Sequence, residues 1–268
     1  MLEATVVLGD DPMVPFLRDW VHQHFGIEFP LDQLDPFRYR VASLCDELGL
    51  DTQSLAARVT AGDVLLARRL ADSVSTNYTY FFREPEVIEL FRGTILPSLP
   101  RELRIWSAAA AGGDEAYTIA ITCLEAMGED APVSILGTDI SERQIRGAEA
   151  GVYPATHLEG LNQERLARHF TPAGLGLYGV VPSLRRMCTF RRLNLSLAPW
   201  PFEQRFHVIF LRNVLYYFDP PTRRQVVESC YDAIEPGGWL ITSLTEPLHD
   251  VPTRWTRLHG ALYRRDPA

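Results

Sequence analysis

Several features that define common protein classes are missing from this sequence. The four cysteines have no CxxC spacing, which argues against a zinc site or a disulfide frame and favours a reducing compartment. No apolar run approaches the length of about 18 residues that suggests a membrane-spanning helix. The first residues, MLEATVVLGDDPMVPF, lack the basic start and apolar core of a signal peptide. These absences predict a cytoplasmic protein without membrane insertion.

The charge balance is acidic, with 34 acidic against 26 basic residues and a formal net charge of -8. Capture of nucleic acid would therefore need a local basic patch, and we expect no nucleic-acid partner. The basic run RRMCTFRR, residues 185–192, is more typical of one solvated strand face, and its alternative use is contact with an acidic protein partner. His22 and His24 lie two positions apart, would not share a helix face, and predict no metal site.

The length of 268 residues suffices for one large and one small domain. From Met13 to about Ala71 the apolar residues recur at helical spacing, which predicts a small all-helical N-terminal domain over residues 1–73. Residues 74–90 would form a linker at the start of a second domain that covers residues 74–268. We expect a monomer.

After Pro100 the pattern changes to alternating strands and helices, which predicts βαβ units and a parallel sheet covered on both faces. GLGLYGVVPSL and RRMCTFRRL interrupt this alternation and predict an antiparallel insertion at about 168–192. The segment ALYRR is a candidate edge strand. The expected strands are 104–110, 134–140, 207–214 and 239–244, and the expected helices are 115–127, one starting at Ser141, and 222–234.

Polar residues follow three of the expected strands, where the ligand crevice of a parallel sheet lies. They occur in Ala109–Glu115, at Asp139, and at Arg212 with Asn213. The glycines in AAAAGGDE allow close approach of a ligand, but the segment is not GxGxxG, and an ordinary tight turn would also explain it. Asp139 has the position of an acid that accepts both hydroxyl hydrogens of a ribose. Its alternative role is to cap a helix beside Ser141.

Asp114 and Glu115 would repel a pyrophosphate, which argues against NAD and favours a nucleoside with a cationic end. S-adenosylmethionine has this combination. The chain also resembles the chemoreceptor glutamate methyltransferases, the CheR family, over nearly its full length. The matching motifs, in family order, are TNYTYFFRE (76–84), RIWSAAAAGGDEAYTIA (104–120), ILGTDIS (135–141) with GAEAGVYP (147–154), RLNL (192–195), and FHVIFLRNVLYYFD (206–219) with EPGGWL (235–240).

The resemblance implies a Rossmann-like methyltransferase domain with a small inserted antiparallel β-subdomain, preceded by a small helical domain. It implies transfer of a methyl group from S-adenosyl-L-methionine to glutamate carboxylates of a chemoreceptor, with S-adenosyl-L-homocysteine as product. Arg83 and Tyr217 would be the catalytic residues. The cofactor would be bound by Asn77, Thr79, Arg83, Ala109, Glu115, Asp139, Asn194, Leu195, Arg212 and Asn213.

The reaction needs no general base, because a glutamate with a reference pKa of about 4.3 is already a carboxylate at neutral pH. Arg83 would hold that carboxylate and Tyr217 would orient it. The alternatives are an ion pair from Arg83 to Glu84 or Glu86, and a purely packing role for Tyr217.

Three departures from the family pattern put the acceptor in question. AGGDEA replaces STGEEP, which we expect to loosen the first turn; Leu244 replaces a histidine; and the loop TPAGLGLYG is shorter than in members that dock on a receptor peptide. Two rival hypotheses therefore remain. One is a methyltransferase of the same build that acts on another protein or a small acid. The other is a non-catalytic S-adenosylmethionine or S-adenosylhomocysteine sensor.

Overall fold

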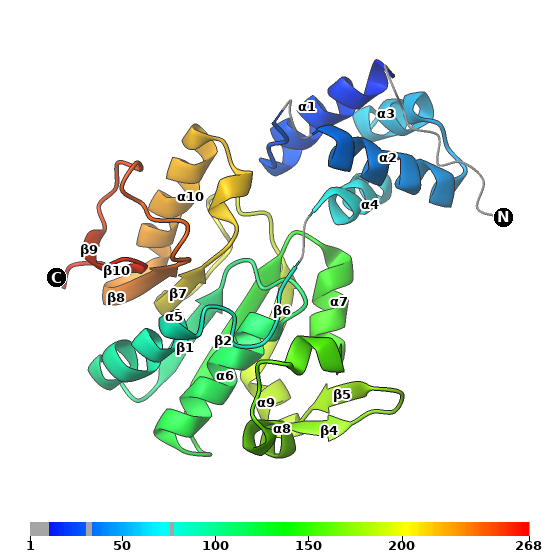
Figure 1. Cartoon of the computed structure of the whole chain (residues 1–268). Coiled ribbons are helices and arrows are strands. Elements are labelled where there is room, and N and C mark those ends of the chain that lie inside the picture. The colour runs from blue at the N-terminus through cyan, green and yellow to red at the C-terminus, as the bar shows by residue number, and fades with distance from the viewer. Residues whose placement is uncertain (1–10, 31–33, 76–77, 268) are drawn as a thin grey trace. The chain divides into compact units, whose positions relative to one another are not determined.

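The computed structural model describes residues 11–30, 34–75 and 78–267. The chain divides into two compact units (Figure 1), one made of residues 1–76 with 217–222 and the other of residues 77–216 with 223–268. Among the described residues, no helix has the length and apolar character needed to cross a bilayer. The limits expected from the sequence, a domain boundary at residue 73 and a linker over 74–90, stay predictions.

The first unit consists of helices, as the apolar spacing predicts. Two of its helices start at aspartate N-caps: Asp51 accepts a hydrogen bond from the Ser54 N–H, and Asp63 accepts one from the Leu66 N–H. The helices are α1 (Met13–Phe25), α2 (Leu34–Leu48), α3 (Thr52–Thr60) and α4 (Val64–Val74). Their fully buried side chains include Leu17, Val21, Phe37, Val41, Leu55 and Leu70.

A short segment from late in the sequence, residues 217–222, belongs to this helical unit. Phe218 forms a β-bridge with Ile27, and the carbonyl of Tyr217 accepts a hydrogen bond from the Glu28 N–H at 2.7 Å. The Nε2 atom of His22 lies 2.9 Å from Oδ2 of Asp219. No cluster of His, Cys, Asp and Glu suited to a metal ion occurs in the described part of the chain.

The second unit is built on a seven-stranded sheet of order β6-β2-β1-β7-β8-β10-β9. The first five strands in that order pair in parallel, and β10 is antiparallel to both β8 and β9. Its strands are β1 (Leu103–Ser107), β2 (Val133–Asp139), β6 (Cys188–Arg192), β7 (Phe206–Leu211), β8 (Ile234–Thr242), β9 (Thr256–His259) and β10 (Leu262–Arg264). The predicted α/β fold is confirmed.

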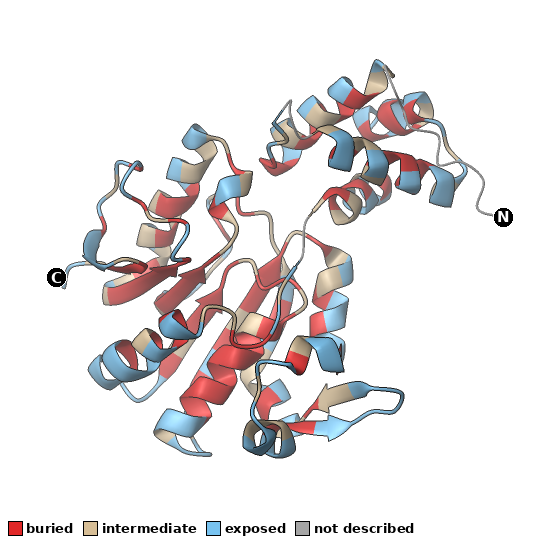
Figure 2. Cartoon of the chain, viewed as in Figure 1, coloured by how far each residue is buried: buried red, intermediate tan, exposed pale blue. Residues whose placement is uncertain are grey.

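Helices connect these strands and cover the sheet. Figure 2 shows that α6, which crosses one face, is buried along most of its length, as a helix in the core of an α/β layer should be. The helices of this part of the chain are α5 (Pro85–Leu90), η2 (Phe91–Ile95), η3 (Leu96–Ser98), α6 (Asp114–Met127), α7 (Glu142–Ala150) and α10 (Pro220–Ala233), with η5 at Leu215–Tyr217.

A separate three-stranded antiparallel sheet, of order β3-β5-β4, follows α7. It consists of β3 (Val152–Pro154), β4 (Phe170–Pro172) and β5 (Leu177–Val180), with η4 (Ala155–Leu158), α8 (Gln163–His169) and α9 (Pro182–Met187) around it. The small sheet itself is as expected, but its strands lie over residues 152–180 instead of 168–192.

The sequence led to a wrong placement for two segments that do contain strands. Residues 188–192 form β6, parallel to β2 in the main sheet, because Phe190 is buried over Gly137, where an added Cβ would lie 2.5 Å from the ring. The preceding residues form α9, with Pro182 in its first turn. The segment ALYRR supplies β10, but β9 occupies the actual sheet edge.

Candidate functional site

The turn after β1 is firmly tied to the neighbouring strands. The N–H of Ala110 donates to the Thr138 carbonyl at 2.8 Å, and the N–H of Ala111 donates to Oδ2 of Asp139 at 2.9 Å. Ala111 has a φ of 44°, a conformation that non-glycine residues rarely adopt and that this hydrogen bond stabilises. Two backbone hydrogen bonds therefore hold this turn, and the expectation that AGGDEA makes it looser than in the family stays a prediction.

Gly113 ends this turn and needs to be glycine for two reasons. Its φ is 92°, and a Cβ at this position would lie 2.8 Å from Cβ of Ala148 and 2.9 Å from the hydroxyl oxygen of Tyr153. The same Tyr153 hydroxyl donates to the carbonyl of Gly112 at 2.7 Å. The start of α6 is thus packed closely against α7 and β3.

Asp139 ends β2 and has a side chain held in one orientation by backbone donors. Its Oδ2 accepts from Ala111 and its Oδ1 accepts from the Ser141 N–H, both at 2.9 Å, and the residue is 8% exposed. Asp139 thus supports the turn before α7, but the helix cap itself is Ser141, whose hydroxyl accepts from the Gln144 N–H. The carboxylate also lies where a ribose would be expected, at the carboxyl end of a central strand.

Arg212 and Glu115 form a buried ion pair at the same edge of the sheet. Nη1 of Arg212, directly after β7, donates to Oε2 of Glu115 at 2.8 Å, and the Ser107 hydroxyl donates to Oε1 of Glu115 at 2.7 Å. Nη2 of Arg212 donates to the carbonyl of Arg83 at 2.6 Å. Nε of Arg212 is buried and has no hydrogen-bond partner among the described residues. One guanidinium therefore joins β7, α6 and the segment before α5.

Glu84 is a member of the site that the sequence reasoning missed. Its carboxylate accepts hydrogen bonds from the Ser243 hydroxyl at 2.8 Å, the Leu244 N–H at 3.0 Å and the Asn213 side-chain amide at 3.1 Å. Burial alone would raise the pKa of Glu84, but these hydrogen bonds and the charge of Arg212 outweigh it and hold the pKa below its ordinary value. The sequence did offer one signal for Glu84, which is the last residue of the motif TNYTYFFRE.

The structure also shows the surroundings of Arg83, for which an ion pair was the alternative role, and of Leu244, which replaces the family's histidine. Nη1 of Arg83 donates to the Tyr78 carbonyl at 2.9 Å, and no ion pair joins Arg83 to Glu84 or Glu86 in the described part of the chain. Leu244 contributes its backbone N–H to the Glu84 carboxylate while its side chain is 45% exposed. Replacement of the family's histidine therefore leaves this backbone contact in place.

Glu246 is a second buried acid that the sequence reasoning missed. It is 3% exposed and accepts hydrogen bonds from the N–H groups of Asn213 and Tyr216. Burial raises the pKa of Glu246, and the hydrogen bonds from these N–H groups offset part of the rise. The contact holds Asn213 at a φ of 56°, with its side chain turned toward Glu84 and Ser243.

The remaining expected site residues have different surroundings. Thr79 and Ala109 are half-buried, and Leu195 is buried. Oδ1 of Asn194 accepts from the backbone N–H and the hydroxyl of Ser196. Asn77 lies outside the described residues, and Tyr217 belongs to the helical unit. Direct hydrogen bonds thus join Arg83, Glu115 and Arg212, while Glu84 connects Asn213 to Arg212 through an ion pair at 3.7 Å. Asp139 lies on the adjacent turn.

The charges of this group suit a cationic nucleoside. Glu84, Glu115 and Asp139 contribute carboxylates against the two guanidinium groups of Arg83 and Arg212, so the site carries an excess of negative charge. An acid at the end of the second strand is suited to a ribose in nucleotide-binding α/β sheets, and the excess of negative charge beside it fits one class of them, the S-adenosylmethionine-dependent methyltransferases.

The chain belongs to the CheR methyltransferase family. The family model described as "CheR methyltransferase, SAM binding domain" matches residues 77–263. The chain is 31% identical over 240 residues to chemotaxis protein methyltransferase 1 of Pseudomonas aeruginosa, covering 84% of this chain and 87% of that protein. It is 33% identical over 274 residues to chemotaxis protein methyltransferase 1 of Vibrio cholerae, covering 97% of this chain and 99% of that protein.

Solved structures give a weaker likeness. The N-methyltransferase NodS from Bradyrhizobium japonicum, in complex with S-adenosyl-l-homocysteine, is 16% identical, with a TM-score of 0.37 and coverage of 61% of this chain and 62% of that chain. A likeness at this level carries no weight in the assignment. The family match makes this protein a CheR-family methyltransferase with S-adenosylmethionine as its methyl donor.

Proposed function

We propose that the protein methylates glutamate side chains of another protein, the cytoplasmic helices of a chemoreceptor, giving glutamate methyl esters and S-adenosyl-L-homocysteine. The observation that carries this proposal is the attachment of the segment around Arg83 to the carboxyl edge of a methyltransferase sheet through Arg212 and Glu84. The chemotaxis methyltransferases among its relatives support the acceptor class. A cytoplasmic monomer and a helical domain over residues 1–73 belong to the same proposal.

The cofactor residues follow from the chemistry of each group. S-adenosylmethionine, when bound, supplies a methyl group activated by a positively charged sulfur. Asp139 would accept hydrogen bonds from the ribose hydroxyls, and Glu115 would attract the cationic amino-acid part. Asn194 and Leu195 would flank the adenine, and Thr79, Ala109 and Asn213 would line the remaining wall. Asn77 is assigned with them from its motif alone.

The chain's work in the transfer is positional, because the acceptor is already ionised at neutral pH. Arg83 would hold the acceptor carboxylate. One of its nitrogens, Nη1, donates to the Tyr78 carbonyl, and the other N–H groups of the five in a guanidinium would bind the carboxylate. A very tight grip would stabilise the ground state and slow the transfer, so the benefit of Arg83 is alignment and exclusion of water. Tyr217 is assigned to the same step from its motif alone.

Transfer of radiolabelled methyl groups tests the proposal. The full chain is incubated with methyl-labelled S-adenosylmethionine and a chemoreceptor cytoplasmic fragment, and alkali then releases ester methyl groups as methanol. We expect alkali-labile label on the fragment, and a kcat lowered by about 100-fold in Arg83→Ala, the loss typical of a group that positions reactants. Arg101→Ala, at an exposed arginine ahead of β1, is the control.

Two results would redirect the proposal. Label on a small acid, with none on receptor fragments, would replace the protein acceptor by a small molecule. Tight binding of S-adenosylmethionine without transfer to any carboxylate would favour the sensor hypothesis.

A further inference from the structure

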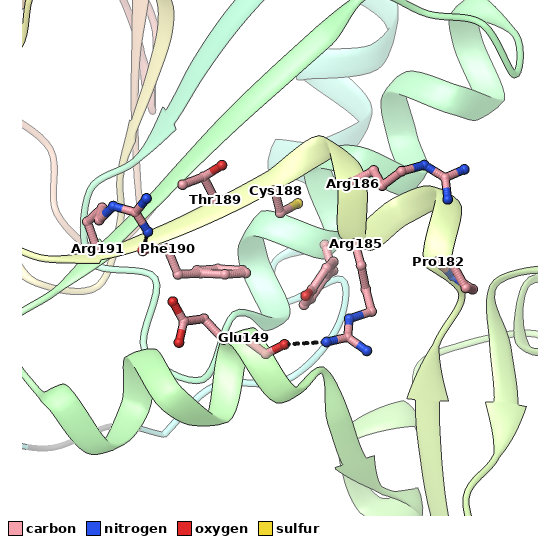
Figure 3. Close-up of a pocket in the computed structure, with 9 residues that line it drawn as sticks. Glu149, Pro182, Arg185, Arg186, Cys188, Thr189, Phe190 and Arg191 are labelled. Atoms are coloured by element: carbon pink, nitrogen blue, oxygen red, sulfur yellow. Dashed lines mark hydrogen bonds between the residues drawn. The ribbon is translucent and has the colours of Figure 1, made fainter.

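An open pocket of about 420 Å³ has a lining that includes none of the polar residues described at the carboxyl edge (Figure 3). It is bounded by α7, α9 and β6, and Figure 3 shows Arg185 reaching from α9 across the gap to the backbone of Glu149 on α7. Its floor includes the buried rings of Tyr117 and Phe190. The remaining lining residues are Pro182, Arg186, Cys188, Thr189 and Arg191.

The pocket borders a free strand edge. β6 is the terminal strand of the main sheet, and among the described residues only β2 pairs with it. The outer side of such a strand presents backbone N–H and C=O groups that another chain can pair with. Thr189 and Arg191 of β6 are exposed, and the side chain of Arg191 donates to the Phe190 carbonyl at 2.7 Å. An added strand can pair along this edge once the Arg191 side chain gives up its hydrogen bond to the Phe190 carbonyl.

The charge of the pocket is opposite to that of the protein. Arg185, Arg186 and Arg191 are exposed, and in the described part of the chain none of them forms an ion pair with a carboxylate. Many other arginines are paired with acids, for example Arg165 with Glu125. Glu149 is the one acidic residue of this lining, so the three guanidinium groups leave a local excess of positive charge that attracts anionic groups, although the chain has a net charge of -8.

Protection of the edge is a competing explanation. Charged side chains on edge strands discourage pairing between copies of a protein, and Arg191 alone would serve that purpose. Arg186 lies on α9 and not on the strand, and protection does not require an apolar floor. The same positive charges that repel a copy of this edge favour a strand with acidic side chains.

We propose that the groove formed by β6, α7 and α9 docks an extended acidic segment of a partner protein as an added strand on β6. Carboxylates of the segment would pair with Arg186 and Arg191, and its intervening apolar side chains would lie over Tyr117 and Phe190. The pairing combines backbone hydrogen bonds for affinity with alternating side chains for selectivity. The inference does not depend on the acceptor assigned above.

Fluorescence anisotropy with the full chain tests this docking. The probe is a labelled peptide of alternating glutamate and valine, compared with a lysine–valine peptide and with the acidic peptide N-methylated at alternate backbone nitrogens. We expect the acidic peptide alone to bind, more weakly at high salt. The variant Arg186→Glu/Arg191→Glu should bind it about tenfold more weakly or worse, because two attractions become repulsions.

The matched control is Arg224→Glu/Arg257→Glu, which makes the same charge change on α10 and on β9, the strand at the opposite edge of the sheet. It should leave peptide affinity within about twofold of the wild type. Hydrogen exchange should show added protection of residues 188–192 with the acidic peptide.

Several outcomes would overturn the proposal. They are equal weakening by the control variant, undiminished binding of the N-methylated peptide, and absence of binding by every peptide. Displacement of the acidic peptide by an equal concentration of inorganic phosphate would show a site for small anions and not a strand-docking site. A normal thermal unfolding midpoint for both variants excludes misfolding as the cause of any loss.

Discussion

The guanidinium of Arg212 donates from Nη1 to Oε2 of Glu115 at 2.8 Å, with the two side chains 2% and 13% exposed. This contact joins the residue after β7 to the first turn of α6, while Nη2 of the same arginine donates to the Arg83 carbonyl. Buried ion pairs of this kind contribute little net stability when intact, because desolvation of both charges offsets their attraction. Their loss is costly when one partner alone is removed.

Glu115→Gln should therefore lower the free energy of unfolding by about 3 kcal/mol, because Arg212 keeps its buried charge and loses a carboxylate partner. Urea denaturation followed by circular dichroism measures the change. The double variant Glu115→Gln/Arg212→Met should recover part of the loss, and Glu86→Gln, an exposed acid in the first turn of α5, serves as control. Strictly additive effects of the two single changes would contradict this account.

Asp139→Ala should weaken S-adenosylmethionine binding by at least about tenfold, since each hydrogen bond to a charged group contributes about 1.5–3 kcal/mol. Isothermal titration calorimetry with the full chain gives the affinity. Asp130→Ala, an exposed acid ahead of β2, is the matched control and should bind as the wild type does. Equal affinity for both variants would remove Asp139 from the cofactor site and leave it as a support for the Ala111 turn.

Much of this arrangement could be predicted from the sequence, because apolar runs identify buried strands and parallel topology brings their carboxyl ends together. Asp139, Arg212 and Asn213 were expected at that edge for this reason. The placement of β6 could not be predicted in the same way. A short strand with one buried residue fits either sheet, and the choice depends on how Phe190 packs over Gly137.

The contribution of Glu84 was also beyond local pattern reading. Its hydrogen bond from Ser243 joins residues 159 positions apart, so no window of sequence contains both partners. For Glu84, sequence spacing offered only an ion pair with Arg83, as the alternative to the assigned role of Arg83, because spacing identifies neighbours in sequence as partners. The backbone of Glu84, at a φ of 53°, turns its carboxylate toward Ser243 and Leu244.

Gly113→Ala should destabilise the protein more than Gly62→Ala. Both glycines have a positive φ, 92° and 86°, so an added Cβ strains the backbone at either position. A Cβ at Gly113 meets Ala148 at 2.8 Å, whereas nothing lies within 4 Å of one at Gly62. We expect a cost of about 1 kcal/mol at Gly62 and about 1–3 kcal/mol more at Gly113 from overpacking. Equal urea midpoints for the two variants would show that α7 shifts at no cost to make room for the added Cβ.

The His157–Asp114 pair predicts a stability difference that depends on pH. Nδ1 of His157 lies 2.7 Å from Oδ1 of the fully buried Asp114, and this hydrogen bond, against the effect of burial, raises the pKa of the imidazole. The stabilisation is therefore complete below the ordinary histidine pKa of about 6.5 and is lost as the pH rises through the higher pKa of the folded state. His157→Gln should accordingly lower the urea midpoint more at about pH 6 than at about pH 9.

His259→Gln, at an exposed position of β9, is the control for that measurement and should show no such difference. Burial lowers the pKa of His169 and of His207, which gives the opposite pH dependence, but both residues are present in wild type and variant. Their contributions cancel when the two stabilities are subtracted at each pH. A difference between wild type and His157→Gln that stays constant from acidic to basic pH would show that the charge of His157 contributes nothing to the anchoring of Asp114 at the start of α6.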